Sequence, residues 1–162
     1  MTRPPRRAPA RAPGWWTTAA VAAVVAAAAS HGCAGPPDGF VLTISRFAVS
    51  LDCASGAPLL ALDADVVADD TAGDGDAHVV PVRARFDVLT HSLRVGLDPG
   101  VADVIAGGTV TFTVTGSETV AAGVCDACDG GPLSSFVAPT FIFHVNGARV
   151  EAVAMPSALV CN

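Results

Sequence analysis

The sequence predicts an all-β protein built as an antiparallel β-sandwich. Apolar and polar residues alternate with a period of two along most of the chain after residue 39. Turn residues separate these segments at regular spacing, and no segment among them has the periodicity of a long helix. A small β-barrel is the alternative, because periodicity does not show whether a sheet closes on itself.

Residues 1–32 are predicted to be a secretion signal peptide. Four arginines and no acidic residue precede an uncharged apolar run at residues 15–29. A helix of that run would reach about 22 Å, which is short of a hydrocarbon core of about 30 Å. A short membrane anchor that stays attached is the alternative.

Cys33 is predicted to carry a lipid anchor. Ser30-His31-Gly32-Cys33 resembles a bacterial lipobox in its glycine and cysteine, although Ser30 and His31 depart from the usual residues. Residues 33–39 are rich in Gly and Pro and would form a tether. Removing Cys33 from five cysteines leaves four, which can pair completely. Cleavage after Ala27-Ala28-Ala29, without lipidation, is the alternative.

Residues 40–162 are predicted to form a single domain with an acidic surface. Without the signal peptide, five arginines face fifteen acidic residues, a formal net charge of −10, and the chain has no lysine. This balance argues against nucleic-acid binding, which depends on basic side chains. Both tryptophans lie in the signal peptide and tyrosine is absent, so the domain offers no Trp or Tyr platform for a ligand. A protein or apolar-ligand partner stays unidentified.

The first strand begins at Phe40 and contains a shift in its alternation. Its expected inward residues are Phe40, Leu42 and Ile44, followed on the opposite parity by Phe47, Val49 and Leu51. The shift at Ser45-Arg46 indicates a β-bulge. After a turn at residues 55–58, the second strand directs its apolar residues Leu60, Leu62, Ala64 and Val66 to one face.

The third strand is expected to direct Val80, Val82, Ala84, Phe86 and Val88 inward. Pro81 then falls on the outer parity and suggests an edge or a break, because proline cannot donate to a ladder. Leu93, Val95 and Leu97 alternate in a fourth strand. Val101, Val104 and Ile105 have helical spacing and predict a single helical turn. Residues 109–115 form the clearest strand, with threonines outward and Val110, Phe112 and Val114 inward.

A C-terminal hairpin is predicted around Asn146-Gly147, since both residues tolerate the positive φ of a type I′ turn. The turn pairs Val145 with Ala148, Phe143 with Val150 and Phe141 with Ala152, all on one face. About seven strands result, which is similar to an immunoglobulin-like sandwich in size and strand number.

The remaining four cysteines, Cys53, Cys125, Cys128 and Cys161, are predicted to form structural disulfides, as is common in exported domains. Of the three possible pairings, we favour Cys53–Cys161 with Cys125–Cys128, because the first bond would close a loop over most of the domain. Alternatively, the Cys125/Cys128 motif could serve thiol-redox chemistry or bind a metal. It runs into loop sequence, and no second motif completes a zinc site.

The acidic loop at residues 69–76 could bind calcium, although it lacks EF-hand spacing. The alternative is a solvated turn. His78, His91 and His144 have no ligand-pair spacing and are expected to be surface residues.

No nucleophile elbow, zinc-protease or phosphate-loop motif occurs. The sequence therefore predicts a protein without enzymatic activity, metal or cofactor. We expect an exported envelope protein of structural or binding type, anchored in a membrane by its lipid. A thiol or metal protein and a calcium-dependent adhesion module are the alternatives.

Overall fold

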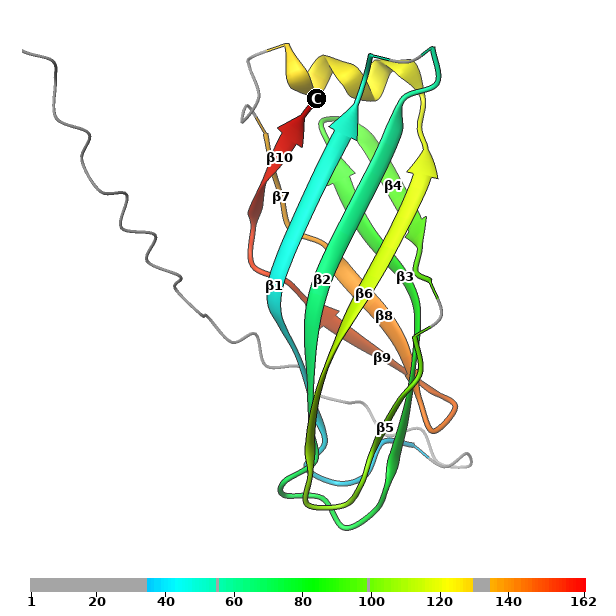
Figure 1. The fold of residues 1–162 in the computed structure, drawn as a ribbon, viewed down its shortest axis with the longest axis vertical. Helices are drawn as coiled ribbons and strands as arrows, with labels where there is room; N and C mark the ends of the chain where they lie inside the picture. Colours follow the sequence, from blue (N-terminus) through cyan, green and yellow to red (C-terminus); the bar gives the residue numbers. More distant parts are fainter. Residues whose placement is uncertain (1–34, 55, 99, 130–134) are drawn as a thin grey trace, which may run out of the picture.

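The computed structural model describes residues 35–54, 56–98, 100–129 and 135–162 (Figure 1). The predicted signal peptide and Cys33 lie outside these residues. The strands are β1 (Val41–Asp52), β2 (Leu59–Asp69), β3 (Ala77–Val88), β4 (His91–Gly96), β5 (Ala102–Val104), β6 (Thr109–Thr119), β7 (Phe136–Val137), β8 (Thr140–Val145), β9 (Ala148–Val153) and β10 (Ser157–Cys161). One 3-10 helix, η1 (Ala122–Cys128), follows β6.

The strands form two sheets that face each other, as Figure 1 shows. The first, sheet A, has the order β6-β2-β1-β10-β7. The second, sheet B, has the order β4-β3-β8-β9, and β5 also pairs with β3. The described strands thus form a sandwich rather than a closed barrel, and the predicted fold class is confirmed.

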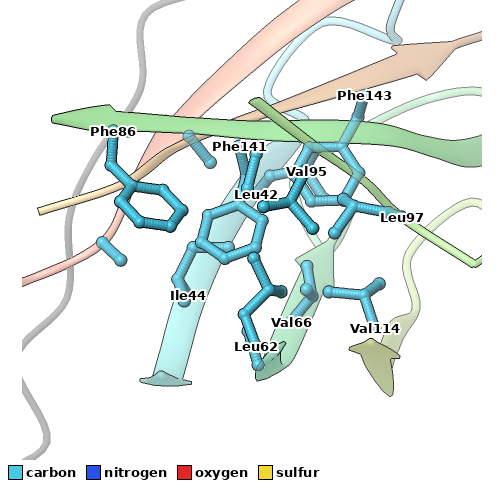
Figure 2. Close-up of a cluster of buried hydrophobic side chains, with 14 of the residues drawn as sticks. Leu42, Ile44, Leu62, Val66, Phe86, Val95, Leu97, Val114, Phe141 and Phe143 are labelled. Atoms are coloured by element: carbon cyan, nitrogen blue, oxygen red, sulfur yellow. The ribbon is translucent and has the colours of Figure 1, made fainter. Parts of the chain in front are cut away.

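The core fills the space between the two sheets. Figure 2 shows apolar side chains of β1, β2 and β6 meeting those of β3, β4 and β8. Phe141 and Phe143 are fully buried, and the Phe141 ring lies edge-on to that of Phe47, with 5.9 Å between ring centroids. Phenylalanine is well suited to this position because it has no polar group that needs a partner.

Three local predictions are confirmed. The register of β1 against β2 shifts between Ile44 and Arg46, as the predicted bulge requires. Asn146 and Gly147 both have positive φ, and the β8–β9 register pairs Phe143 with Val150 as expected. In β6 the threonines at 109, 111, 113 and 115 are exposed, and Val114 is buried.

The third strand differs from its prediction. Val80 and Val82 are only half-buried and do not face the core, whereas Val79 and Pro81 are buried. The register of β3 against β8 shifts between Pro81 and Arg83, so a β-bulge reverses the parity there. Pro81 pairs with Phe143 of β8, and on the other side of β3 it lies between the residues that pair with β5 and those that pair with β4. This break in the ladder tolerates the amide that proline lacks.

The strand β5 replaces the predicted helical turn, and it pairs with β3. The C-terminal strand β10 pairs in parallel with β1, with Leu159 opposite Val49. Consequently sheet A is mixed rather than purely antiparallel. These short strands lack their own alternation signal, because three to five residues give too few repeats to establish a period.

The edge strands β4 and β6 of the two sheets approach each other closely at Gly116. A Cβ atom at this position would overlap the Gly96 carbonyl oxygen and Val95. Gly116→Ala should therefore lower the free energy of unfolding by about 1–3 kcal/mol, the usual cost of overpacking. Gly96→Ala is the matched control, since its Cβ would meet no atom within 4 Å. Equal losses for both variants in urea denaturation would contradict this account.

Candidate functional site

Two disulfides tie η1 to the ends of two neighbouring strands. Cys53, just after β1, bonds to Cys125, with 6.0 Å between Cα atoms. Cys161, the last residue of β10, bonds to Cys128, with 5.7 Å between Cα atoms. In Figure 1 the helix crosses the end of the sandwich beside the C-terminus. The helix is therefore fixed as a cover over this end of the core, where Val124 and Ala127 are buried.

The favoured pairing of Cys53 with Cys161 and of Cys125 with Cys128 is wrong. The parallel pairing of β1 and β10 does bring Cys53 and Cys161 to the same end of sheet A. However, the motif forms a 3-10 helix, whose three residues per turn bring Cys125 and Cys128 onto one side. Each cysteine then reaches a different strand. The loops span 72 and 33 residues, and each bond is worth about 4 kcal/mol in the chain-entropy model.

This pairing bears on the redox and metal alternatives. All four of these cysteines are engaged in disulfides, so Cys125 and Cys128 do not form a dithiol pair. Across the described ranges, no group of three or more His, Cys, Asp or Glu side chains lies close enough together to hold a metal ion. The two disulfides indicate an oxidising environment of the kind that exported proteins meet.

The acidic loop at the opposite end contains a buried carboxyl group. Asp70 is fully buried, and neither carboxyl oxygen has a hydrogen-bond partner among the described residues. Its backbone is held firmly, because its N–H donates to the Gly108 carbonyl (2.9 Å) and its carbonyl accepts from Gly73 (2.9 Å). The carboxyl group packs directly against Gly73, where a Cβ would overlap it. Any other residue at position 73 would therefore force the Asp70 carboxyl group to move.

Burial raises the pKa of Asp70, and the charges of Asp74, Asp76 and Asp69 raise it further. These three neighbouring carboxylates differ in their hydrogen bonding. Asp69 accepts from the Thr71 N–H (2.9 Å), and this bond lowers the pKa of Asp69. Asp76 accepts from the Ala106 N–H (2.9 Å), whereas Asp74 is exposed. An unpaired carboxyl among three carboxylates needs a proton or a cation to be stable when buried.

The outer face of sheet A carries an ion-pair cluster. Arg46 pairs with Asp63 (3.0 Å) and Asp65 (2.6 Å) across the β1–β2 ladder. The hydroxyl of Thr113 on β6 also donates to Asp65 (2.8 Å). Arg46 and Thr113 together lower the pKa of Asp65. The cluster is exposed, so it contributes little to stability.

The outer face of sheet B has the opposite character. The basic face, as we call it, carries Arg83 and Arg85 of β3, Arg94 of β4 and Arg149 of β9. Arg149 pairs with Glu151. The side chains of the other three arginines make no hydrogen bond or ion pair with any described residue. Four of the five arginines after Cys33 are thus gathered on one sheet.

The histidines are surface residues or partly exposed. His78 contacts Asp103 across the β3–β5 pair (2.6 Å), and His144 is exposed opposite Arg149. His91 is half-buried at the start of β4. The structure does not bring the three together into a site.

Sequence reasoning missed two of these features. Composition gives no sign that Asp70 is buried and Asp69 is not, but Asp70 continues the inward parity of Val66 and Ala68, and extending the alternation into the loop would have found it. Alternation already places Arg83 and Arg85 on the outward side of the third strand, and the Asn146-Gly147 hairpin places Arg149 on the outward side of its own strand. The sequence does not show that these strands belong to the same sheet, which depends on the pairing of β3 with β8.

Comparison with known proteins adds little to this geometry. No family model matches the chain, and no curated protein matches it. A solved structure titled "X-ray structure of Northeast Structural Genomics Consortium target SoR45" is similar, with a TM-score of 0.43 and 8% identity over 76% of this chain and 88% of that chain. The fold and site therefore define this protein only as a disulfide-linked β-sandwich domain. In the described part, no helix has the length and apolarity needed to span a bilayer.

Asp70→Asn should raise the free energy of unfolding by about 1 kcal/mol at neutral pH, because it removes a buried charge that lacks a partner. The raised pKa of Asp70 means that the folded state binds its proton more tightly than the unfolded state does. The destabilisation is therefore present above the folded-state pKa and disappears as pH falls to the ordinary value of 3.8. Denaturation curves of the native protein and of Asp70→Asn, recorded from neutral pH down to pH 3.8, measure the difference in stability.

The matched control is Asp126→Asn, which removes an exposed carboxylate at the other end of the sandwich. It should change stability by less than about 0.5 kcal/mol at every pH. A loss of stability for Asp70→Asn at neutral pH would show instead that the charged carboxylate has a favourable partner.

Proposed function

We propose that the chain is an exported, non-catalytic envelope protein of structural or binding type, attached to a membrane surface through a lipid on Cys33. The two disulfides carry this proposal, because they suit an oxidising compartment outside the cytoplasm. The basic N-terminus and the apolar run before Cys33 support export. The domain begins immediately after a short Gly/Pro tether, which suits a module held close to its anchor.

The disulfide arrangement also weighs against the thiol and metal alternative. A CxxC motif used in exchange cycles between a dithiol and a local disulfide. Here each cysteine of the motif instead joins η1 to a different strand, so reduction would release the cover from the end of the core. We therefore interpret the motif as structural.

Intact mass of the protein exported from a bacterial host tests the proposal. We expect an N-terminus at Cys33 with the added mass of a lipid, and no thiol that reacts with an alkylating agent before reduction. Reduction should add two hydrogen atoms for each of the two disulfides. Peptide mapping should find Cys53 linked to Cys125 and Cys128 linked to Cys161. An unmodified N-terminus at or before Cys33 would refute the lipid anchor. Two reactive thiols or bound zinc or copper would favour the thiol and metal alternative.

Calcium binding by the acidic loop is the second candidate function, favoured by the buried and unpaired Asp70. Calcium prefers clustered carboxylate and carbonyl oxygens, and extracellular sites bind it at millimolar concentrations. The described side chains do not converge on a metal position. Binding would have to draw Asp74 or Asp76 toward Asp70.

If this second candidate is correct, millimolar calcium should raise the melting temperature by a few degrees, since a ligand that binds only the folded state stabilises it. A chelator should reverse the shift, and Asp70→Asn should abolish it. Magnesium at equal concentration serves as the control for ionic strength. An unchanged melting temperature with calcium would eliminate this candidate.

A further inference from the structure

We propose that the basic face of sheet B is a docking surface for a bilayer that contains anionic phospholipids, with Arg83, Arg85 and Arg94 binding the headgroup phosphates. The inference rests on the proposed attachment through Cys33 and adds to it an orientation. The domain would lie on its side, with sheet B against the membrane.

The first argument is the unsatisfied charge. Arg85 and Arg94 lie directly opposite each other on β3 and β4, and like charges in that position destabilise a sheet. Arg83 is two residues from Arg85 on the same face and lies opposite Gly96, which has no side chain to pair with it. Asp87 is two residues beyond Arg85 on the same face, yet no ion pair joins any of the three guanidinium groups to a described carboxylate. Guanidinium groups bind phosphate oxygens in a bidentate geometry, which makes an external phosphate a suitable partner.

The second argument is the apolar side chains on the basic face. Ile142 faces outward on β8 between Arg83 and Glu151, yet only 3% of it is exposed. The long stems of its neighbours are the groups that can cover it. Val153 on β9 is 47% exposed on the same face. Arginine stems beside an exposed valine suit the boundary between headgroups and acyl chains.

The third argument is where the tether leaves the domain. The Gly35 carbonyl accepts a hydrogen bond from the Asn146 side chain (3.4 Å), and Asn146 lies in the β8–β9 turn of sheet B. Cys33 precedes Gly35 by two residues in the sequence. A lipid on Cys33 would therefore hold one end of sheet B at the membrane, and the sheet needs only to tilt for its basic face to make contact.

The fourth argument concerns the fifteen acidic residues, which an anionic surface repels. Asp63 and Asp65 lie on the outer face of sheet A, and packed sheets are about 10 Å apart. This separation exceeds the Debye length of about 8 Å at physiological ionic strength. The acidic loop lies at the tether end, where it would oppose an upright orientation. Both effects favour the orientation in which sheet B faces the membrane.

Co-sedimentation with vesicles tests the proposal without the lipid. The protein is the mature chain with Cys33→Ser, and the vesicles contain phosphatidylcholine alone or with phosphatidylglycerol. We expect binding only to the anionic vesicles at low salt, and its loss at about 0.5 M salt. The triple variant Arg83→Gln, Arg85→Gln, Arg94→Gln should reduce the partition coefficient by roughly 100-fold, at about fivefold for each arginine.

Arg46→Gln is the matched control, because it removes the same charge from the opposite sheet and should not weaken binding. A triple substitution of the same arginines by lysine should retain most of the binding, and circular dichroism checks that every variant is folded. Equal loss with Arg46→Gln, or binding to a soluble polyanion such as polyphosphate but not to vesicles, would overturn the proposal. Intact mass separately decides whether Cys33 is lipidated, so the failure of either idea can be recognised.

Discussion

The parallel pairing of β10 with β1 is the constraint on which the rest of the structure depends. It inserts a five-residue strand between β1 and β7 and brings the C-terminus to the end of β1. The Cys53 N–H donates to the Asn162 carbonyl (3.4 Å), and the Asn162 N–H donates to the Leu51 carbonyl (3.0 Å). Only in this arrangement do both cysteines lie beneath η1, so the two disulfides follow from the pairing.

Local signals predicted most of the sandwich, because a hairpin or a bulge is determined by residues close in sequence. Asn146-Gly147 determines its own turn and the register of the twelve residues paired around it. The shift in β1 was readable because apolar residues flank it on both parities. In contrast, β10 pairs with a strand more than a hundred residues away. No local pattern specifies such a partner, and the favoured disulfide pairing was wrong for the same reason.

The candidate site was less predictable than the fold. Asp70 is buried because β2 and the β5–β6 turn close around it, with the Gly107 N–H donating to its carbonyl (3.1 Å). This contact spans 37 positions and leaves no trace in the loop's composition. Alternation places Arg83 and Arg85 outward, as the structure has them, but their union with Arg149 in one sheet depends on the pairing of β3 with β8, which no local pattern specifies. The β3 bulge changes only which residues before Arg83 face the core.

Two features of this domain are unfavourable for stability within the described residues. One is the unpaired carboxyl of Asp70, and the other is the opposition of Arg85 and Arg94. Each is expected to cost on the order of 1 kcal/mol, which is less than the contribution of a single disulfide of this loop length. The stability contributed by the disulfides therefore allows the domain to tolerate residues that do not favour folding.

Departures from local rules of this kind are concentrated at functional positions in natural proteins. Asp70 lies at the end opposite the disulfides, whereas Arg85 and Arg94 lie nearer to η1, three residues from the β3–β4 turn. In each case the missing partner is a charge of defined sign, a cation for Asp70 and an anion for the arginines. The proposals above place that charge outside the chain, in a calcium ion and in the phospholipid headgroups of the membrane to which the tether leads.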